Sequence, residues 1–156
     1  MNGPGEATPF RLEAFYAGLL HGWGHLVDHR GGGERRMTAV LRGDWDGQVL
    51  TLDQTWTAEG SPPERRLWRI RPTTNGYSGT AADIVGTAEA TWVDGGLRWS
   101  YQTDVPVGET VWRLACEEEL QPQTANVATV QVKIGKFGLA IAEIHMIVSR
   151  AAPVAG

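Results

Sequence analysis

Apolar and polar residues alternate with a period of two along most of this chain. The alternation is interrupted by short segments rich in glycine, proline and aspartate, such as "GDWDG", "EGSPPE", "VDGG" and "PVGE". A period of two puts alternate side chains on one face of a strand, and the interruptions are typical of turns. The pattern predicts strands over residues 22–29, 34–43, 48–58, 64–71, 76–85, 87–93, 96–105, 110–120, 125–134 and 138–149.

One segment near the start follows a different period. In "FRLEAFYAGLL", Phe10, then Ala14 or Phe15, then Leu19 recur near helical spacing, which predicts a short N-terminal helix. Short strands joined by tight turns favour an antiparallel meander, and closing the meander into a barrel removes its exposed edges. We therefore predict an all-β fold, a single up-and-down β-barrel of about eight to ten strands with the helix across one end. A barrel of that size is either filled by side chains or holds one small ligand.

The length of 156 residues suits one domain with a single core. We expect the barrel to occupy residues 10–150. The first nine residues are rich in glycine and proline, and residues 151–156 read "AAPVAG", so both ends are expected to be flexible.

Charge and composition weigh, weakly, against several kinds of partner. The formal net charge of −4 weighs against nucleic acid and against an anionic membrane surface, because each attracts a basic face. No run approaches the ~20 apolar residues of a membrane span. The beginning, "MNGPGEATPF", lacks a basic cluster followed by an apolar run, so we expect no secretory signal and a cytoplasmic location. No pattern in the chain indicates a cofactor or an oligomeric state.

Three histidines lie four residues apart in "HGWGHLVDH", at His21, His25 and His29. In a strand, His21 and His25 would be ~13 Å apart, and on a helix His21 and His29 would be ~12 Å apart along the axis. Neither spacing brings three imidazoles within the ~2 Å bonds of one zinc ion. We predict surface histidines on a glycine-rich first strand, and no metal site.

Several polar residues fall in phase with large apolar ones on the predicted strands. Asp83 is in phase with Tyr77 and Ala81, and Glu143 and His145 share one face of the last strand. Both faces of that strand are apolar, so its inward face stays open. The candidate ligand-binding residues on inward faces are Gln54, Trp56, Arg66, Trp68, Trp99, Tyr101, Trp112 and Glu118.

A charge inside a barrel is expensive unless it is paired, so an inward Arg66 should meet Glu143 or Asp83. A few polar groups among aromatic walls are typical of a small-molecule pocket. Three interpretations stay open: the barrel binds a small, largely apolar molecule; it is an acid–base enzyme of isomerase, cyclase or hydratase type with Glu143, Asp83 or His145 as catalytic residues; or the ion pair is structural in a filled barrel. The lone Cys116 excludes an internal disulfide and is expected to be a buried, inert thiol.

Several stretches together resemble a bacterial family, domain-of-unknown-function family 3833. They are "FYAGLLHGWGHLVDHRG", "GDWDGQVLTLDQTW", "RLWRI", "GYSGTAADIVGTAEA", "LRWSYQTDVPVG" and "KFGLAIAEIHMIVSR". The resemblance implies a lipocalin-like barrel without supplying an activity, and it adds Asp28 to the candidate site. Family members often carry a glutamate at the position of Gln54. Many relatives resemble envelope lipoproteins, but this chain shows no lipobox cysteine.

Overall fold

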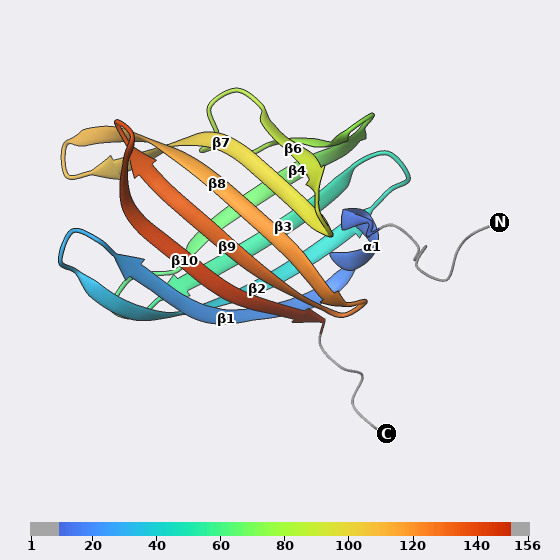
Figure 1. The fold of residues 1–156 in the computed structure, drawn as a ribbon, viewed down its shortest axis with the longest axis horizontal. Helices are drawn as coiled ribbons and strands as arrows, with labels where there is room; N and C mark the ends of the chain where they lie inside the picture. The colour runs from blue at the N-terminus through green and yellow to red at the C-terminus, as the bar shows by residue number, and fades with distance from the viewer. Residues whose placement is uncertain (1–9, 151–156) are drawn as a thin grey trace, which may run out of the picture.

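Ten antiparallel strands form the wall of a closed barrel in the computed structural model, which describes residues 10–150 (Figure 1). The expectations for residues 1–9 and 151–156 lie outside the described residues. The elements are α1 (Leu12–Phe15), β1 (Gly18–Asp28), β2 (Gly33–Trp45), β3 (Leu50–Ala58), β4 (Glu64–Thr73), β5 (Gly76–Thr80), β6 (Ala88–Val93), β7 (Gly96–Val107), β8 (Thr110–Thr124), β9 (Val127–Lys136) and β10 (Leu139–Arg150).

Each strand pairs with its neighbours in sequence, and β1 closes the barrel by pairing with β10. The closing pair runs from Leu20 opposite Arg150 to Asp28 opposite Ala142. Closure removes both exposed edges of the sheet. The predicted all-β, up-and-down barrel with a short helix near its N-terminus is confirmed.

The helix is shorter than its predicted range. Leu12–Phe15 forms a single turn, and Gly18, with a φ of 86°, then turns the chain into β1 four residues earlier than the alternation suggested. Within the described residues, no helix is long and apolar enough to cross a membrane.

Hydrogen bonds hold α1 across one end of the barrel. The hydroxyl of Tyr77 accepts a bond from the Leu12 backbone N–H at 3.0 Å and donates one to Oε1 of Glu13 at 2.6 Å. The guanidinium of Arg150, at the end of β10, donates to the carbonyl oxygens of Ala14 and Phe15. The first turn and the last strand therefore secure each other, and we call this the closed end.

The two ends differ in how their inward side chains are packed. At the closed end five leucines are almost completely buried: Leu20, Leu50, Leu52, Leu97 and Leu120. Burying one such side chain stabilises the fold by about 1.5–3 kcal/mol. Toward the opposite end, the open end, several large inward side chains keep accessible surface: Leu26, Trp56, Trp112, Ile134 and Met146.

The wall between β4 and β7 is built differently from the rest. The strand predicted over 76–85 ends at Thr80, and residues 81–87 connect β5 to β6 along the side of β7. The Asp104 N–H donates to the Asp83 carbonyl at 3.1 Å, and the Val85 N–H donates to the Gln102 carbonyl at 2.9 Å. These bonds fix Asp83 beside the interior of the barrel.

Candidate functional site

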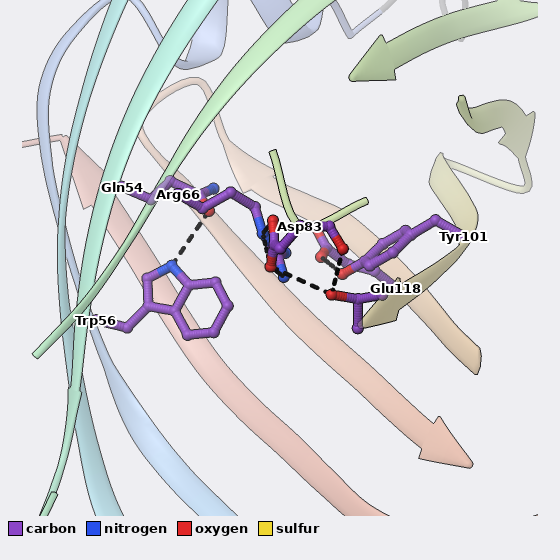
Figure 2. A network of polar contacts seen from close by, with 7 residues as sticks. Gln54, Trp56, Arg66, Asp83, Tyr101 and Glu118 are labelled. Atoms are coloured by element: carbon purple, nitrogen blue, oxygen red, sulfur yellow. Dashed lines mark hydrogen bonds and ion pairs between the residues drawn. The ribbon is translucent and has the colours of Figure 1, made fainter. Parts of the chain in front are cut away.

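A buried arginine lies at the centre of the candidate site. Arg66, on β4, points into the barrel with only 8% of its surface exposed, and it forms a double hydrogen bond with Asp83 (Figure 2). Its Nε donates to Oδ1 at 3.0 Å and its Nη2 donates to Oδ2 at 2.7 Å. Of the two carboxylates that the sequence offered as partners, the structure selects Asp83.

The aspartate is itself held in place by β7. The hydroxyl of Thr103 donates to the Asp83 carbonyl at 2.8 Å and lies 3.2 Å from its Oδ2. Burial alone would lower the pKa of Arg66. The hydrogen bond to Asp83 and the negative charge of that carboxylate, together with the neighbouring Tyr101, outweigh burial and leave the pKa above its ordinary value. The guanidinium therefore stays charged inside the barrel.

Aromatic rings surround the guanidinium. The centre of Arg66, Cζ, lies 4.8 Å from the ring of Trp56, 5.5 Å from Trp68 and 5.6 Å from Tyr101. Trp99 joins the group through Trp68, with ring centroids 5.3 Å apart. Cation–π contacts of this kind contribute about 0.5–2 kcal/mol each. The predicted aromatic wall is thus assembled from β3, β4 and β7.

Two further predicted residues stand at the edge of this group. Gln54 pairs with Arg66 across β3 and β4, and its Oε1 accepts a hydrogen bond from Nε1 of Trp56 at 3.2 Å (Figure 2). Trp112 lies apart, near the open end, where Arg30 and Lys136 lie 5.5 Å and 5.1 Å from its ring.

A second carboxyl group faces the interior from β8. The hydroxyl of Tyr101 donates to Oε1 of Glu118 at 3.3 Å. Burial raises the pKa of Glu118, while the charge of Arg66 and the bond from Tyr101 partly oppose the rise. The thiol of Cys116 is buried as expected, and burial raises its pKa to about 11, which keeps it protonated and unreactive.

The ion pair does not use every donor of the guanidinium. Nε and Nη2 of Arg66 bind Asp83, whereas Nη1 takes no part in that pair, and the neighbouring Tyr101 raises the pKa of Arg66 further. Tyr16 is also buried, and burial, followed by the charge of Glu118, raises its pKa. Within residues 10–150, no fully buried side-chain nitrogen or oxygen lacks a partner.

Residues 4–150 match the model of a protein family described as "Protein of unknown function (DUF3833)". The chain belongs to the DUF3833 family. No curated protein matches it. Membership agrees with the resemblance drawn from the sequence, and the closed barrel is consistent with the lipocalin-like barrel that the resemblance implied. The family description assigns no activity, so the geometry and chemistry of the site are the basis for proposing a function.

In this DUF3833 chain, the face of β10 that carries Glu143 and His145 points outward, and the other face of the strand points into the barrel. Ala142, Ile144 and Val148 are buried inside, and Glu143 and His145 lie on the outer wall. Inside, both polar groups would need buried partners, whereas outside Glu143 accepts from Gln131 at 3.3 Å and lies 3.0 Å from Nε2 of His29. The sequence left the inward face of this strand open, and in the structure Glu143 and His145 lie outside the barrel, away from Arg66.

The histidines lie on the outside of the wall. His21, His25 and His29 are all exposed, as predicted for surface histidines, and His25 lies 3.6 Å from Glu34. The hydrogen bond from His29 lowers the pKa of Glu143, helped by Gln131. In the part of the chain that the structure describes, no three His, Cys, Asp or Glu side chains are grouped to hold a metal ion.

Asp28, which the family resemblance added, lies at the open end and does not reach Arg66. Its Oδ1 accepts from the backbone N–H of Arg30 at 2.8 Å and lies 3.3 Å from that residue's Nε. The backbone bond from Arg30, followed by the side-chain bond, lowers the pKa of Asp28. Asp28 therefore fixes the turn between β1 and β2.

Sequence reasoning missed two residues of the site. Thr103 shares the alternation of Trp99 and Tyr101, so its inward direction was readable although its bond to Asp83 was not. Tyr16 lies between α1 and β1, outside any strand, and no periodicity in the sequence indicates that it is buried or that the charge of Glu118 raises its pKa.

Proposed function

We propose that the protein binds one small, largely apolar molecule in the open half of the barrel, with Arg66 holding its polar end. The observation that carries the proposal is the buried, charged guanidinium of Arg66, which faces the barrel interior and binds Asp83 through Nε and Nη2 only. Its Nη1 is the group that an acceptor on a ligand would pair with, and a hydrogen bond from a charged donor is worth about 1.5–3 kcal/mol.

The apolar part of the ligand would contact the inward side chains of the open half. Trp56, Ile134 and Met146 keep accessible surface there, although they face the interior. Mostly apolar walls with a few fixed polar groups are the usual composition of a small-molecule site.

The polar end of the ligand is expected to be a hydrogen-bond acceptor. A guanidinium can only donate hydrogen bonds, so Nη1 of Arg66 requires an acceptor. A carboxylate, carbonyl or hydroxyl oxygen on the ligand would provide one.

Native mass spectrometry of the purified chain is the first experiment. A non-covalent mass that disappears on denaturation supports the proposal and gives the mass of the ligand. The quantitative test uses cis-parinaric acid, a fluorescent apolar chain that ends in a carboxylate. Binding with a dissociation constant in the micromolar range is expected, and the absence of both a bound mass and probe binding would overturn the proposal.

Matched variants then test the role of Arg66. The double variant Arg66→Gln/Asp83→Asn removes the inner pair without leaving a lone charge. Arg65→Gln/Asp53→Asn removes an equivalent pair on the outer face of the wall, between β4 and β3. A lost charge-assisted hydrogen bond is worth about 1.5–3 kcal/mol, so the inner variant should bind the probe at least about tenfold more weakly. Equal affinity of the two variants would contradict an anchor at Arg66.

A second candidate function, acid–base catalysis in the same site, is favoured by Glu118. A carboxyl group with a raised pKa beside Tyr101 could hold or move a proton on an apolar substrate, as an isomerase, cyclase or hydratase requires. Glu118→Gln should then keep the ligand found by mass spectrometry but abolish its conversion. A carrier would show no conversion with either protein.

A further inference from the structure

Exposed apolar side chains gather on two hairpin tips at the open end. Phe137 and Leu139, at the β9–β10 turn, are 90% and 70% exposed, and Val111, beside the β7–β8 turn, is 65% exposed. We call these three residues the rim cluster. Both hairpins turn at the end of the barrel opposite α1, on the left in Figure 1. The contact of Lys136 with Trp112 shows that the tips lie close together.

The backbone at Phe137 is unfavourable for such a residue. Phe137 has a φ of 54°, and it is the one non-glycine residue within 10–150 with a positive φ. It is followed by Gly138 with a φ of 78°, in a two-residue turn that normally favours asparagine or glycine. Left-handed backbone costs a side chain of this kind about 1–2 kcal/mol. A strained conformation that holds a phenylalanine in water points to a role outside the fold.

Cationic side chains stand directly behind these tips. The ammonium of Lys136 lies 4.4 Å from the ring of Phe137 and 5.1 Å from that of Trp112, over which Arg30 also lies. Within the described residues Arg30 is paired with Asp28, whereas Lys136 has no ion pair. Glu109 is the acidic residue of the β7–β8 turn. Lys136 is therefore the cation that stands, without an ion pair to the described residues, between the apolar tips and the ring of Trp112.

We propose that the open end docks on the surface of a lipid bilayer, with the rim cluster inserted among the lipids and Lys136 at the level of the headgroups. Apolar groups below and cations at the interface are the arrangement that holds proteins on membranes. A second copy of the chain is a poorer occupant, because a stable dimer buries about 800 Å² on each partner and three side chains on separate tips offer far less. The inference goes beyond the proposed function, because it uses none of the residues around Arg66.

Flotation of the full chain with phosphatidylcholine vesicles, with and without phosphatidylglycerol, tests the proposal. The double variant Phe137→Asn/Leu139→Thr removes two apolar tips while giving the turn a residue that it favours. Its partitioning into the vesicle fraction should fall by about tenfold or more, as the loss of two buried apolar side chains implies. Lys136→Gln should lower partitioning by about fivefold, and only on vesicles that contain phosphatidylglycerol.

The matched control is Ile147→Thr, which removes an apolar side chain from the outer wall, where Ile147 is 42% exposed. It should partition as the unmodified protein does. The proposal is overturned if the unmodified protein does not float, or if the rim variant and the control float equally. Loss of a dimer in the rim variant without any vesicle binding would assign the cluster to a second copy instead.

The same variants separate this proposal from the function proposed above. Arg66→Gln/Asp83→Asn should float normally while it loses affinity for cis-parinaric acid. Phe137→Asn/Leu139→Thr should bind cis-parinaric acid normally in the absence of vesicles while it fails to float. Each proposal therefore fails on a different variant.

Discussion

Arg65 and Arg66 are neighbours on β4, and each binds an aspartate through two hydrogen bonds, yet they lie on opposite sides of the wall. The outer pair joins Arg65 to Asp53 at 2.7–2.8 Å, and the inner pair joins Arg66 to Asp83 at 2.7–3.0 Å. The geometry is nearly the same. The surroundings differ, because Arg65 is exposed and Arg66 is buried among aromatic rings.

The effect of an ion pair on stability therefore depends on which side of the barrel wall it occupies. Exposed pairs contribute about 0–1 kcal/mol, because water already solvates both charges. A buried charge that loses its partner destabilises the fold by several kcal/mol. The outer pair is therefore dispensable, whereas the inner pair is required to keep a cation in the barrel interior.

The largest expected effect is that of Asp83→Asn, which leaves the guanidinium of Arg66 without its counter-charge. Because Asp83 is 41% exposed and water can reach it, we expect a loss of about 2–3 kcal/mol in the free energy of unfolding, below the full cost of a buried pair. The matched change Asp53→Asn should lose no more than about 0.5 kcal/mol. Urea unfolding measures both losses. Equal losses would contradict the expectation that the inner ion pair matters more for stability than the outer one.

Glu118→Gln extends the comparison to pH. Because burial raises the pKa of Glu118, the folded protein keeps this proton at pH values where the unfolded chain has released it. The stability gained from the neutral carboxyl is complete below the unfolded pKa of about 4.3 and is lost as the pH rises through the raised folded value. Unfolding midpoints in urea should therefore favour the glutamine variant increasingly as the pH rises from about 4 through the raised folded pKa of Glu118. A constant difference over that range would show that Glu118 is not buried as a neutral group.

Phe137→Asn changes an exposed residue, yet it is expected to alter the stability of the fold. Relief of the left-handed strain at this turn is expected to raise the free energy of unfolding by about 1 kcal/mol. The midpoint of urea unfolding reports the gain. A loss of stability would mean that the exposed ring supports the fold, for instance through Lys136.

The smallest effect is expected for Glu143→Gln on the outer wall. The pKa of Glu143 is lowered by its bond to His29, so the pair adds a little stability above the carboxyl's ordinary pKa and loses it as the pH falls through the lowered value. As the pair is exposed, the loss at neutral pH should stay within about 0.5 kcal/mol. Binding of cis-parinaric acid should not change, and a change would place Glu143 in the site after all.

The inner pair was largely predictable from the sequence, and the orientation of β10 was not. Arg66 alternates with Trp68 and Ile70, so its inward direction followed from the period, and the cost of burying its charge required a carboxylate. Asp83 was chosen from strand phase, although it lies on the connection after β5 and reaches Arg66 because Thr103 and β7 hold that connection. The predicted strand over 76–85 thus indicated the right partner, although β5 ends at Thr80, before Asp83.

On β10 the alternation did not indicate which face points inward, because Ile141 and Ile147 on one face are as apolar as Ile144 and Val148 on the other. The orientation of β10 depends on its pairing with β1 and on the hydrogen bonds that Glu143 makes on the outer surface. Both involve segments that are distant in the sequence. Tyr16 escaped prediction for a related reason, since its place near Glu118 depends on how α1 covers the closed end.

The pairing of β1 with β10 has a consequence for how the chain is made. Residue 20 cannot find its partner until residue 150 has been synthesised, and synthesis proceeds at about 5–20 residues per second. For several seconds the first strand therefore leaves the ribosome with an unpaired edge, which is the part of a nascent sheet most exposed to misassembly. Arg150, which binds the carbonyls of α1, then closes the wall and secures the helix in the same final step.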